Sequence, residues 1–330
     1  MVGDVAEREQ ASEAEPADRT SLSPRPDLPH AVAGERHEIT GRAGRLSYYV
    51  AGSGPPLLLL HSINAAASAY EVGPIFARLA RARRVYAPDL PGFGFSDRAP
   101  RRYDPRLLTD AIHQMLDEIA THDGRQPVDA LAISLSAEFL ARAAVERPER
   151  FRRLVLVTPT GFARGAGRLR GQPGSTREIP GLHAFVSFPP WGQVLFQLLV
   201  SRPSITFFLR KTFGRDDIDP GLIDYAYATA HQPGAANAPF AFLAGRLFSR
   251  DIRDLYEALQ QPVWLAHGTR GDLADFSEAD WVRQRPNWRL EAFATGALPH
   301  FEQPEAFAAK LEAFLAGPHD STSASRSPSP

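Results

Sequence analysis

The sequence contains no cysteine, which excludes disulfide bonds, thiol catalysis and thiolate metal sites. It also has no excess of charge, because 37 basic and 38 acidic residues give a formal net charge of −1, with no basic block to attract nucleic acid. No apolar run reaches the roughly 18 residues that a membrane-spanning helix needs. The first 25 residues show neither the basic start nor the apolar stretch of a secretory signal. We therefore expect a cytoplasmic protein with no membrane span and no nucleic-acid partner.

The chain does have enough apolar residues for a sizeable core, since 43% of its 330 residues are hydrophobic. This length fits two average domains or one larger α/β domain. Both ends are polar and rich in Ser and Pro, so we predict that residues 1–35 and 317–330 are disordered. The folded part is expected to span residues 36–316.

Short apolar runs alternate with longer helical patterns in this part. The runs predict buried strands at residues 57–60, 84–87, 128–133, 154–157 and 263–266, and the helical patterns include residues 105–122 and 135–146. Buried strands separated by helices predict an α/β fold, a parallel sheet with helices on both faces. Residues 37–40 and 46–51 are expected to form an antiparallel hairpin that leads into this sheet.

The alternation stops after Val157 and resumes at Pro262. Residues 162–258 show apolar helical segments, broken by Gly and Pro and rich in aromatic side chains. We interpret them as a helical insertion that divides one α/β domain into residues 36–161 and 259–316.

Ser134 is the first candidate for chemistry. It stands between a predicted strand and a predicted helix, in Ala132-Ile133-Ser134-Leu135-Ser136. A nucleophilic serine on such a tight turn needs small residues two positions before and after it, and Ala132 and Ser136 satisfy this. The alternative is a serine that merely caps the helix.

His300 is the candidate base that would take the proton of Ser134. It lies between the expected strand at residues 288–293 and the final helix, where a loop can carry an imidazole over the sheet edge. Asp272 follows the strand at residues 263–266 and is our preferred orienting acid, with Asp275 as the alternative. Loop aspartates often only form turns.

Acyl transfer also needs donors for the negative oxygen of its intermediate. We predict the backbone N–H of Leu135, at the start of a helix, and the N–H of Ile63, in His61-Ser62-Ile63-Asn64. Asn64 is expected to shape the pocket floor, and Trp191 and His231 of the insertion are candidate pocket residues. The alternative for the Ile63 loop is a run of small residues chosen for close packing.

Together these motifs resemble the α/β-hydrolase superfamily over about residues 46–315. The resemblance rests on His61-Ser62, Asp89-Leu90-Pro91-Gly92-Phe93-Gly94-Phe95-Ser96, Ser134, Gly268 with Asp272, and His300. It implies an eight-stranded, mostly parallel sheet, a triad in the order Ser, Asp, His, and a helical cap formed by residues 162–258. The sequence departs from the family pattern in three places. The turn at Ser134 lacks both usual glycines, and Ser62 replaces another. Gly271 occupies the customary position of the acid, with Asp272 one residue later.

The sequence thus predicts a serine hydrolase that needs no cofactor or metal. The aromatic side chains of the insertion predict a small to medium apolar substrate, because concave sites are lined mainly by apolar side chains. A carboxylic ester is the first choice, because ester hydrolysis is the commoner reaction. Carbon–carbon bond hydrolysis is the alternative within the fold. A ligand-binding protein without activity is the alternative from another class, and a lyase or cofactor-free oxygenase using the same residues also stays open. The oligomeric state is not predicted.

Overall fold

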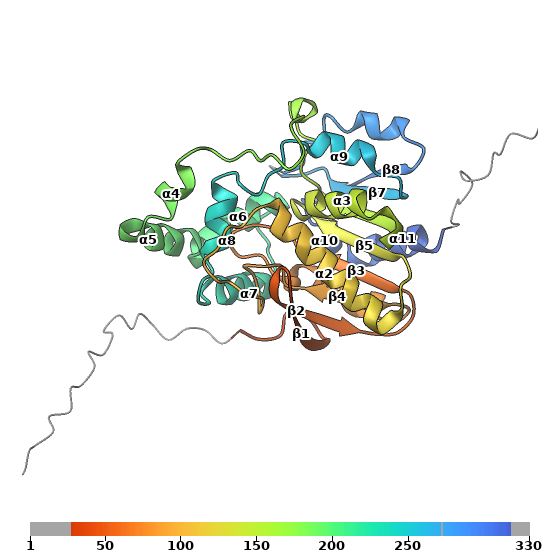
Figure 1. The fold of residues 1–330 in the computed structure, drawn as a ribbon, viewed down its shortest axis with the longest axis horizontal. Coiled ribbons are helices and arrows are strands. Elements are labelled where there is room, and N and C mark those ends of the chain that lie inside the picture. The colour runs from red at the N-terminus through yellow and green to blue at the C-terminus, as the bar shows by residue number, and fades with distance from the viewer. Residues whose placement is uncertain (1–27, 272, 318–330) are drawn as a thin grey trace, which may run out of the picture.

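A computed structural model describes residues 28–271 and 273–317. Its centre is one eight-stranded sheet with the strand order β1-β2-β4-β3-β5-β6-β7-β8 (Figure 1). The strands are β1 (Glu35–Gly41), β2 (Gly44–Ala51), β3 (Pro56–Leu60), β4 (Arg84–Pro88), β5 (Val128–Ile133), β6 (Phe151–Val157), β7 (Val263–Gly268) and β8 (Trp288–Phe293). β1 pairs with β2, and β2 with β4, in antiparallel orientation, whereas every other pairing is parallel. The predicted hairpin and mostly parallel sheet are therefore confirmed.

The middle strands are buried on both faces, as their apolar runs predict. Every residue of β3 and of β5 is buried. Successive side chains point to opposite faces, so Leu58 and Leu60 belong to one hydrophobic cluster and Leu57 and Leu59 to the other. Two cores, one on each face, hold the sheet in place.

Helices cover both faces of the sheet. One core receives side chains from α2 (Pro105–Asp123), α3 (Ser136–Glu146) and α9 (Ile252–Ala258). The other receives side chains from α1 (Gly73–Leu79) and α11 (Pro304–Ala316). This is the doubly covered arrangement that a parallel sheet requires.

The chain between β6 and β7 is helical. It contains α4 (Leu182–Val186), α5 (Pro189–Leu199), α6 (Arg202–Phe213), α7 (Pro220–Ala230), α8 (Asn237–Leu243) and α9. Thr176 and Ser249 form an isolated antiparallel bridge there, and no strand occurs in this part of the described chain. We call residues 162–258 the helical segment.

Residues 28–34 pack against the domain, although the sequence analysis placed them in a disordered end. Ala31 and Val32 are buried, and the Ala31 N–H donates to the Tyr49 hydroxyl at 3.0 Å. Tyr225 donates to the Pro29 carbonyl at 3.0 Å. Two small apolar side chains and these hydrogen bonds tie this segment to the domain. The remaining predicted disorder, at residues 1–27 and 318–330, lies outside the described residues.

Candidate active site

Ser134 occupies a strained turn at the carboxyl end of β5. Its φ of 54° lies in the left-handed region, which in the described chain only one other non-glycine residue, Thr158, shares. The Ser134 N–H donates to the Val157 carbonyl at 2.9 Å, and its carbonyl accepts from the Ala137 N–H at 3.1 Å. Such a conformation costs about 1–3 kcal/mol and persists only where its surroundings hold it. The turn therefore has the geometry that the sequence predicted for a nucleophile elbow.

Thr158 forms a second left-handed turn, at the end of the neighbouring strand β6, with a φ of 45°. Its N–H donates to the Ala266 carbonyl at 2.7 Å, and its buried hydroxyl donates to the Ala297 carbonyl at 2.6 Å. Ala297 lies three residues before His300. The hydroxyl thus ties the end of β6 to the loop that carries the predicted base, a contact that the sequence analysis missed.

His300 is fully buried. It lies in the short helix α10 (Pro299–Glu302) rather than in the expected loop, with Pro299 as the first helical residue. Its Nε2 is 2.8 Å from the Glu71 carbonyl oxygen, and its Nδ1 has no hydrogen-bond partner in the described chain. Burial lowers the pKa of the imidazole to about 4, although the hydrogen bond to Glu71 acts in the opposite direction. The ring is therefore neutral at physiological pH, with Nε2 as the donor.

The loops that carry Ser134 and His300 meet at one edge of the sheet. The Ser136 hydroxyl donates to the His61 carbonyl at 2.5 Å, which joins the elbow to the loop after β3. The next residue of that loop, Ser62, donates to Glu71, whose carbonyl contacts His300. Within the described residues, no hydrogen bond links the Ser134 hydroxyl to His300. The two loops are therefore joined through Glu71 and the loop after β3.

Ile63 and Leu135 are both buried beside this edge. Neither backbone N–H donates a hydrogen bond to another group in the described chain, so both are available as the oxyanion donors that the sequence predicted. Asn64 is exposed and turns back on its own loop. Its Oδ1 accepts from the Ala66 N–H at 2.7 Å, and its Nδ2 donates to the Ser62 hydroxyl at 3.0 Å.

Glu71 is a site residue that the sequence analysis missed. It lies in the short 3₁₀ helix Ala69–Val72 and is buried. Its carboxylate accepts from the Ser62 N–H at 2.8 Å, the Ser62 hydroxyl at 3.0 Å and the Asn64 amide at 3.2 Å. The sequence contained one signal for this role. Glu71 is the single Asp, Glu, Lys or Arg in residues 61–77, which follow the buried strand β3. A carboxylate in such apolar surroundings needs hydrogen-bond donors.

A second buried carboxyl group lies one turn beyond the elbow. Glu138, on α3, accepts from the Thr160 hydroxyl at 2.6 Å and from the Ser249 N–H at 2.7 Å. Burial raises its pKa to about 7, against the opposing effect of these hydrogen bonds. One turn further, Arg142 forms a buried ion pair with Asp251 at 2.7 Å. These contacts attach the helix of the predicted nucleophile to the end of the helical segment.

Of the two candidate acids, the structure describes only Asp275. Asp272, the preferred one, lies outside the described residues. The Asp275 carboxylate is exposed and accepts from the Arg164 N–H and the Ser277 N–H, both at 3.0 Å. These hydrogen bonds, that from Arg164 first, lower the pKa of Asp275 to about 2. None of the hydrogen bonds or ion pairs of the described residues joins Asp275 to His300, so the structure does not assign it the orienting role.

The two pocket candidates of the helical segment differ in exposure: Trp191 is exposed and His231 is half-buried. Trp191 is exposed on α5, with its indole N–H bound to the Phe185 carbonyl at 2.8 Å. Its predicted place in a substrate pocket finds no support. His231 follows α7, where its Nδ1 lies 2.7 Å from the Tyr227 carbonyl and its ring lies against the Tyr227 ring.

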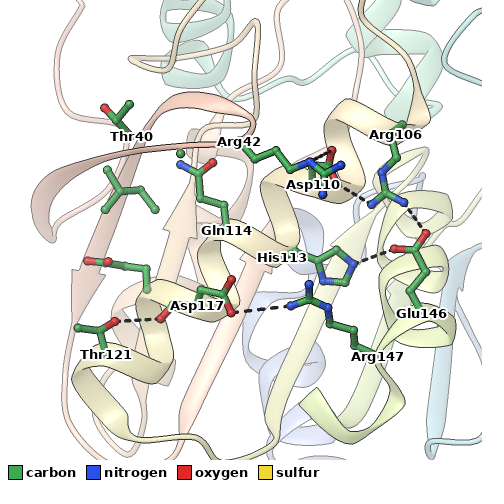
Figure 2. Close-up of a pocket in the computed structure, with 13 residues that line it drawn as sticks. Thr40, Arg42, Arg106, Asp110, His113, Gln114, Asp117, Thr121, Glu146 and Arg147 are labelled. Carbon is green, nitrogen blue, oxygen red and sulfur yellow. Dashed lines mark hydrogen bonds and ion pairs between the residues drawn. The ribbon is translucent and has the colours of Figure 1, made fainter.

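A pocket of about 550 Å³ lies away from these residues, between the β1–β2 turn, α2 and the end of α3 (Figure 2). Basic and acidic side chains face each other across it. His113 lies 2.9 Å from the Glu146 carboxylate, and Arg42 lies 3.3 Å from Asp110. Burial lowers the pKa of His113.

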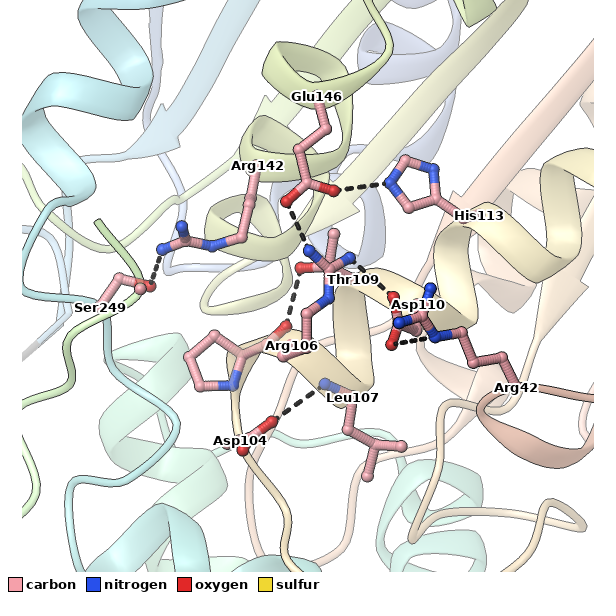
Figure 3. Close-up of polar contacts among 12 residues, drawn as sticks. Arg42, Asp104, Arg106, Leu107, Thr109, Asp110, His113, Arg142, Glu146 and Ser249 are labelled. Atoms are coloured by element: carbon pink, nitrogen blue, oxygen red, sulfur yellow. Dashed lines mark hydrogen bonds and ion pairs between the residues drawn. The ribbon is translucent and has the colours of Figure 1, made fainter.

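The polar contacts around this pocket hold helices together (Figure 3). Arg106 bridges Asp110 at 2.8 Å and Glu146 at 2.5 Å, which joins α2 to α3. Asp104 accepts from the Leu107 N–H at 3.0 Å and so caps the first turn of α2. Within the described residues His113 Nδ1 has no hydrogen-bond partner, whereas the other contacts join α2 to α3. We interpret the cluster as a clamp between the two helices.

The described residues contain no group of three or more His, Asp and Glu side chains placed to hold a metal ion. None of the helices in the described ranges has the length and apolar character to cross a membrane.

The sheet order, the covering helices and the left-handed serine between β5 and α3 define an α/β protein of the hydrolase class. Residues 57–310 match the model of the alpha/beta hydrolase family, and the chain belongs to that family. The resemblance inferred from its motifs is therefore confirmed.

Two curated relatives align with most of the chain. The 2-hydroxymuconate semialdehyde hydrolase of Pseudomonas putida is 26% identical over 298 residues, which cover 84% of this chain and 93% of that protein. The pimeloyl-[acyl-carrier protein] methyl ester esterase of Nitrosomonas europaea is 27% identical over 272 residues, which cover 79% of this chain and 96% of that protein. Both are named as hydrolases, and a hydrolase is what the comparisons support.

Solved structures agree on the fold. The CarC serine hydrolase involved in carbazole degradation has a TM-score of 0.67 at 18% identity, covering 86% of this chain and 99% of that chain. The meta-cleavage product hydrolase CumD of Pseudomonas fluorescens has a TM-score of 0.65 at 19% identity, covering 86% of this chain and 98% of that chain.

Proposed function

We propose that this protein is a cofactor-independent serine hydrolase in which Ser134 is the nucleophile, His300 the general base and Asp272 the orienting acid. The observation that carries the proposal is the left-handed turn of Ser134, a non-glycine residue held at the carboxyl end of β5 at the start of a helix. The neutral state of His300 supports it as well, because only an unprotonated imidazole can accept the serine proton.

The reaction requires one rearrangement at His300. Its ring must exchange the Glu71 carbonyl for the Ser134 hydroxyl, and as the base it must present an unprotonated nitrogen to that hydroxyl. Ser134 Oγ then attacks the carbonyl carbon while His300 takes its proton, and the N–H groups of Leu135 and Ile63 stabilise the oxyanion. The imidazolium returns the proton to the leaving group, and water, activated by the same ring, releases the acyl product.

A carboxylic ester of a small to medium apolar molecule is the proposed substrate. The methyl ester esterase among the relatives supports ester hydrolysis. Carbon–carbon bond hydrolysis is the second candidate, favoured by the similarity to 2-hydroxymuconate semialdehyde hydrolase over 84% of the chain. The helical segment is proposed as the cap that covers the site.

A fluorophosphonate probe tests the nucleophile. The probe is expected to label the wild-type protein on Ser134 and to leave Ser134→Ala unlabelled. Ser53→Ala is the matched control, because it removes an exposed hydroxyl in the turn between β2 and β3 and should retain labelling. Absence of labelling in folded wild-type protein would instead favour the ligand-binding alternative.

Substrate panels separate the two reactions. We expect p-nitrophenyl esters of graded acyl length to be turned over, with a preference among chain lengths, and a β-diketone to be turned over more slowly. The reverse order of kcat/KM would select carbon–carbon hydrolysis. Equal rates on acetate and decanoate would contradict the apolar pocket, and Ser134→Ala is the background for every substrate.

A further inference from the structure

The peptide group of Ala297, three residues before His300, is held from two sides. Its carbonyl accepts from the Thr158 hydroxyl at 2.6 Å, and its N–H donates to the Thr212 carbonyl at 2.9 Å. Thr158 directly follows β6, and Thr212 lies in the last turn of α6. One contact therefore comes from the sheet and the other from the helical segment. Ala297 is buried, so both polar groups depend on these partners.

Thr158 has a backbone conformation that its residue type disfavours. A φ of 45° lies in the left-handed region, where a β-branched residue is an outlier. Glycine would adopt the same turn without steric strain, but glycine has no hydroxyl to donate to Ala297. The strained threonine is thus explained by the use of its buried hydroxyl rather than by the turn alone.

The turn at Thr158 is also joined to the turn at Ser134. The strands β5 and β6 pair in parallel, with Ile133 opposite Val157. The residues that follow them, Ser134 and Thr158, are both left-handed. The Ser134 N–H donates to the Val157 carbonyl at 2.9 Å, immediately before Thr158. Thr158 therefore stands between the predicted nucleophile and the loop that carries the predicted base.

The other hydrogen bonds of this loop come from elsewhere. The Thr295 carbonyl accepts from the N–H groups of Thr269 and Arg270, at 2.9 and 3.0 Å, and the Gly296 N–H donates to the Glu302 carboxylate at 2.6 Å. Among the described residues, Thr158 makes the hydrogen bond that joins this loop to the elbow side of the sheet. Its hydroxyl is thus placed to set the distance between the two.

We propose that Thr158 is a positioning residue for His300. Its hydroxyl fixes the Ala297 peptide and so sets where the imidazole stands relative to Ser134. The proposal rests on the proposed function, in which the ring exchanges the Glu71 carbonyl for the Ser134 hydroxyl. With the preceding peptide fixed, this exchange is a rotation of the ring rather than a shift of the backbone. Misplacement of a reacting group by about 1 Å is enough to slow catalysis strongly.

Three substitutions separate the hydroxyl of Thr158 from its shape and its turn. Thr158→Val keeps the size and the branching but removes the donor, whereas Thr158→Ser keeps the donor. Thr158→Gly removes the hydroxyl together with the strain of the turn. Thr109→Val is the matched control, because Thr109 is buried on α2 and its hydroxyl donates to the Pro105 carbonyl at 2.7 Å.

Kinetics on an ester distinguishes positioning from a structural role. We expect kcat to fall about tenfold or more in Thr158→Val and Thr158→Gly with little change in KM, because the base is misplaced while substrate binding remains. Thr158→Ser and Thr109→Val should keep kcat within about twofold of the wild type. Thr158→Gly should be more stable to urea than Thr158→Val, since it relieves the turn, so its low kcat would not follow from lost stability.

The titration of His300 reports the placement of the ring without any catalysis. NMR of histidine-labelled protein, with His300→Asn to assign the signal, should give a pKa of about 4 in the wild type. In Thr158→Val the pKa should rise toward the ordinary 6.5, because a looser loop admits water to the ring. Thr158→Ser and Thr109→Val should titrate as the wild type does.

Four results would overturn the proposal: wild-type kcat in Thr158→Val, equal losses of kcat in Thr158→Val and Thr158→Ser, an equal loss in Thr109→Val, or an unchanged His300 titration in Thr158→Val. A folded wild type that neither reacts with the fluorophosphonate probe nor turns over esters would instead refute the proposed function. The His300 titration would then decide by itself whether Thr158 places the ring.

Discussion

The Nε2 atom of His300 donates a hydrogen bond to the backbone carbonyl of Glu71, at 2.8 Å and across 229 residues of sequence. The carboxylate of the same glutamate accepts hydrogen bonds from the N–H and hydroxyl of Ser62, at the start of the loop that carries Ile63. One buried residue therefore contacts both the predicted base and the loop predicted to hold the oxyanion.

This position of Glu71 predicts the effect of Glu71→Gln. The amide keeps the size of the side chain but offers one acceptor oxygen in place of two, so it turns a donor toward one of the Ser62 groups. We expect kcat on an ester to fall about tenfold or more, with little change in KM, because the oxyanion loop shifts while substrate binding remains. Steady-state kinetics measures both, and exposed Glu149→Gln is the control. A lower melting temperature with unchanged kcat would reduce Glu71 to a structural role.

The left-handed turn of Ser134 predicts a stability difference between two substitutions. Glycine adopts a φ of 54° without the penalty that alanine carries. Ser134→Gly should therefore be more stable to urea than Ser134→Ala by about 1 kcal/mol. The same pair at exposed Asp117, inside α2, should show the opposite order, because glycine destabilises a helix interior relative to alanine. Equal stability of the two Ser134 variants would contradict strain at the turn.

The choice of acid is decided by kinetics. Asp272→Asn is expected to lower kcat about a thousandfold or more, as the loss of an orienting carboxylate does in serine hydrolases. Asp275→Asn should lower kcat only slightly, because that carboxylate is occupied by Arg164 and Ser277. A larger loss in Asp275→Asn than in Asp272→Asn would reverse the assignment.

His300 predicts that stability falls as the solution becomes more acidic. Its pKa is about 4 in the folded protein against an ordinary value of 6.5, so the unfolded chain binds the extra proton between these values. The buried neutral ring therefore contributes on the order of 3 kcal/mol to the free energy of unfolding above pH 6.5. This contribution is lost as the pH falls toward 4. His300→Asn should remove this dependence in urea unfolding measured across the interval.

Glu138 predicts the opposite slope. Its pKa is about 7 in the folded protein against an ordinary 4.5, so here the folded state binds the extra proton. The contribution of Glu138 to the free energy of unfolding is present below pH 4.5 and is lost as the pH rises toward 7. Relative to wild type, Glu138→Gln should gain stability as the pH rises, whereas His300→Asn should gain stability as the pH falls. Parallel curves for wild type and both variants would contradict the two pKa shifts.

The sequence by itself determined the elements that local pattern controls. Five apolar runs predicted five strands, and all five are present. α2 begins at Pro105, as its helical pattern predicted, and the structure shows Asp104 as its N-cap. The turn at Ser134 was predictable for the same reason, because a strand, a small-residue turn and a helix follow one another directly along the chain. Sequence motifs were also sufficient to place the chain in its family.

Only the tertiary structure decided what surrounds the predicted base. His300 contacts Glu71, and Thr158 contacts Ala297, through segments that are 229 and 139 residues apart. Contacts of this kind depend on how strands are ordered in the sheet and on which loops then share an edge, and neither follows from local periodicity. The sequence also could not show that Trp191, Val194, Leu195 and Leu198 of α5 are exposed. An amphipathic helix has the same sequence pattern whether its apolar side chains meet a core or the solvent.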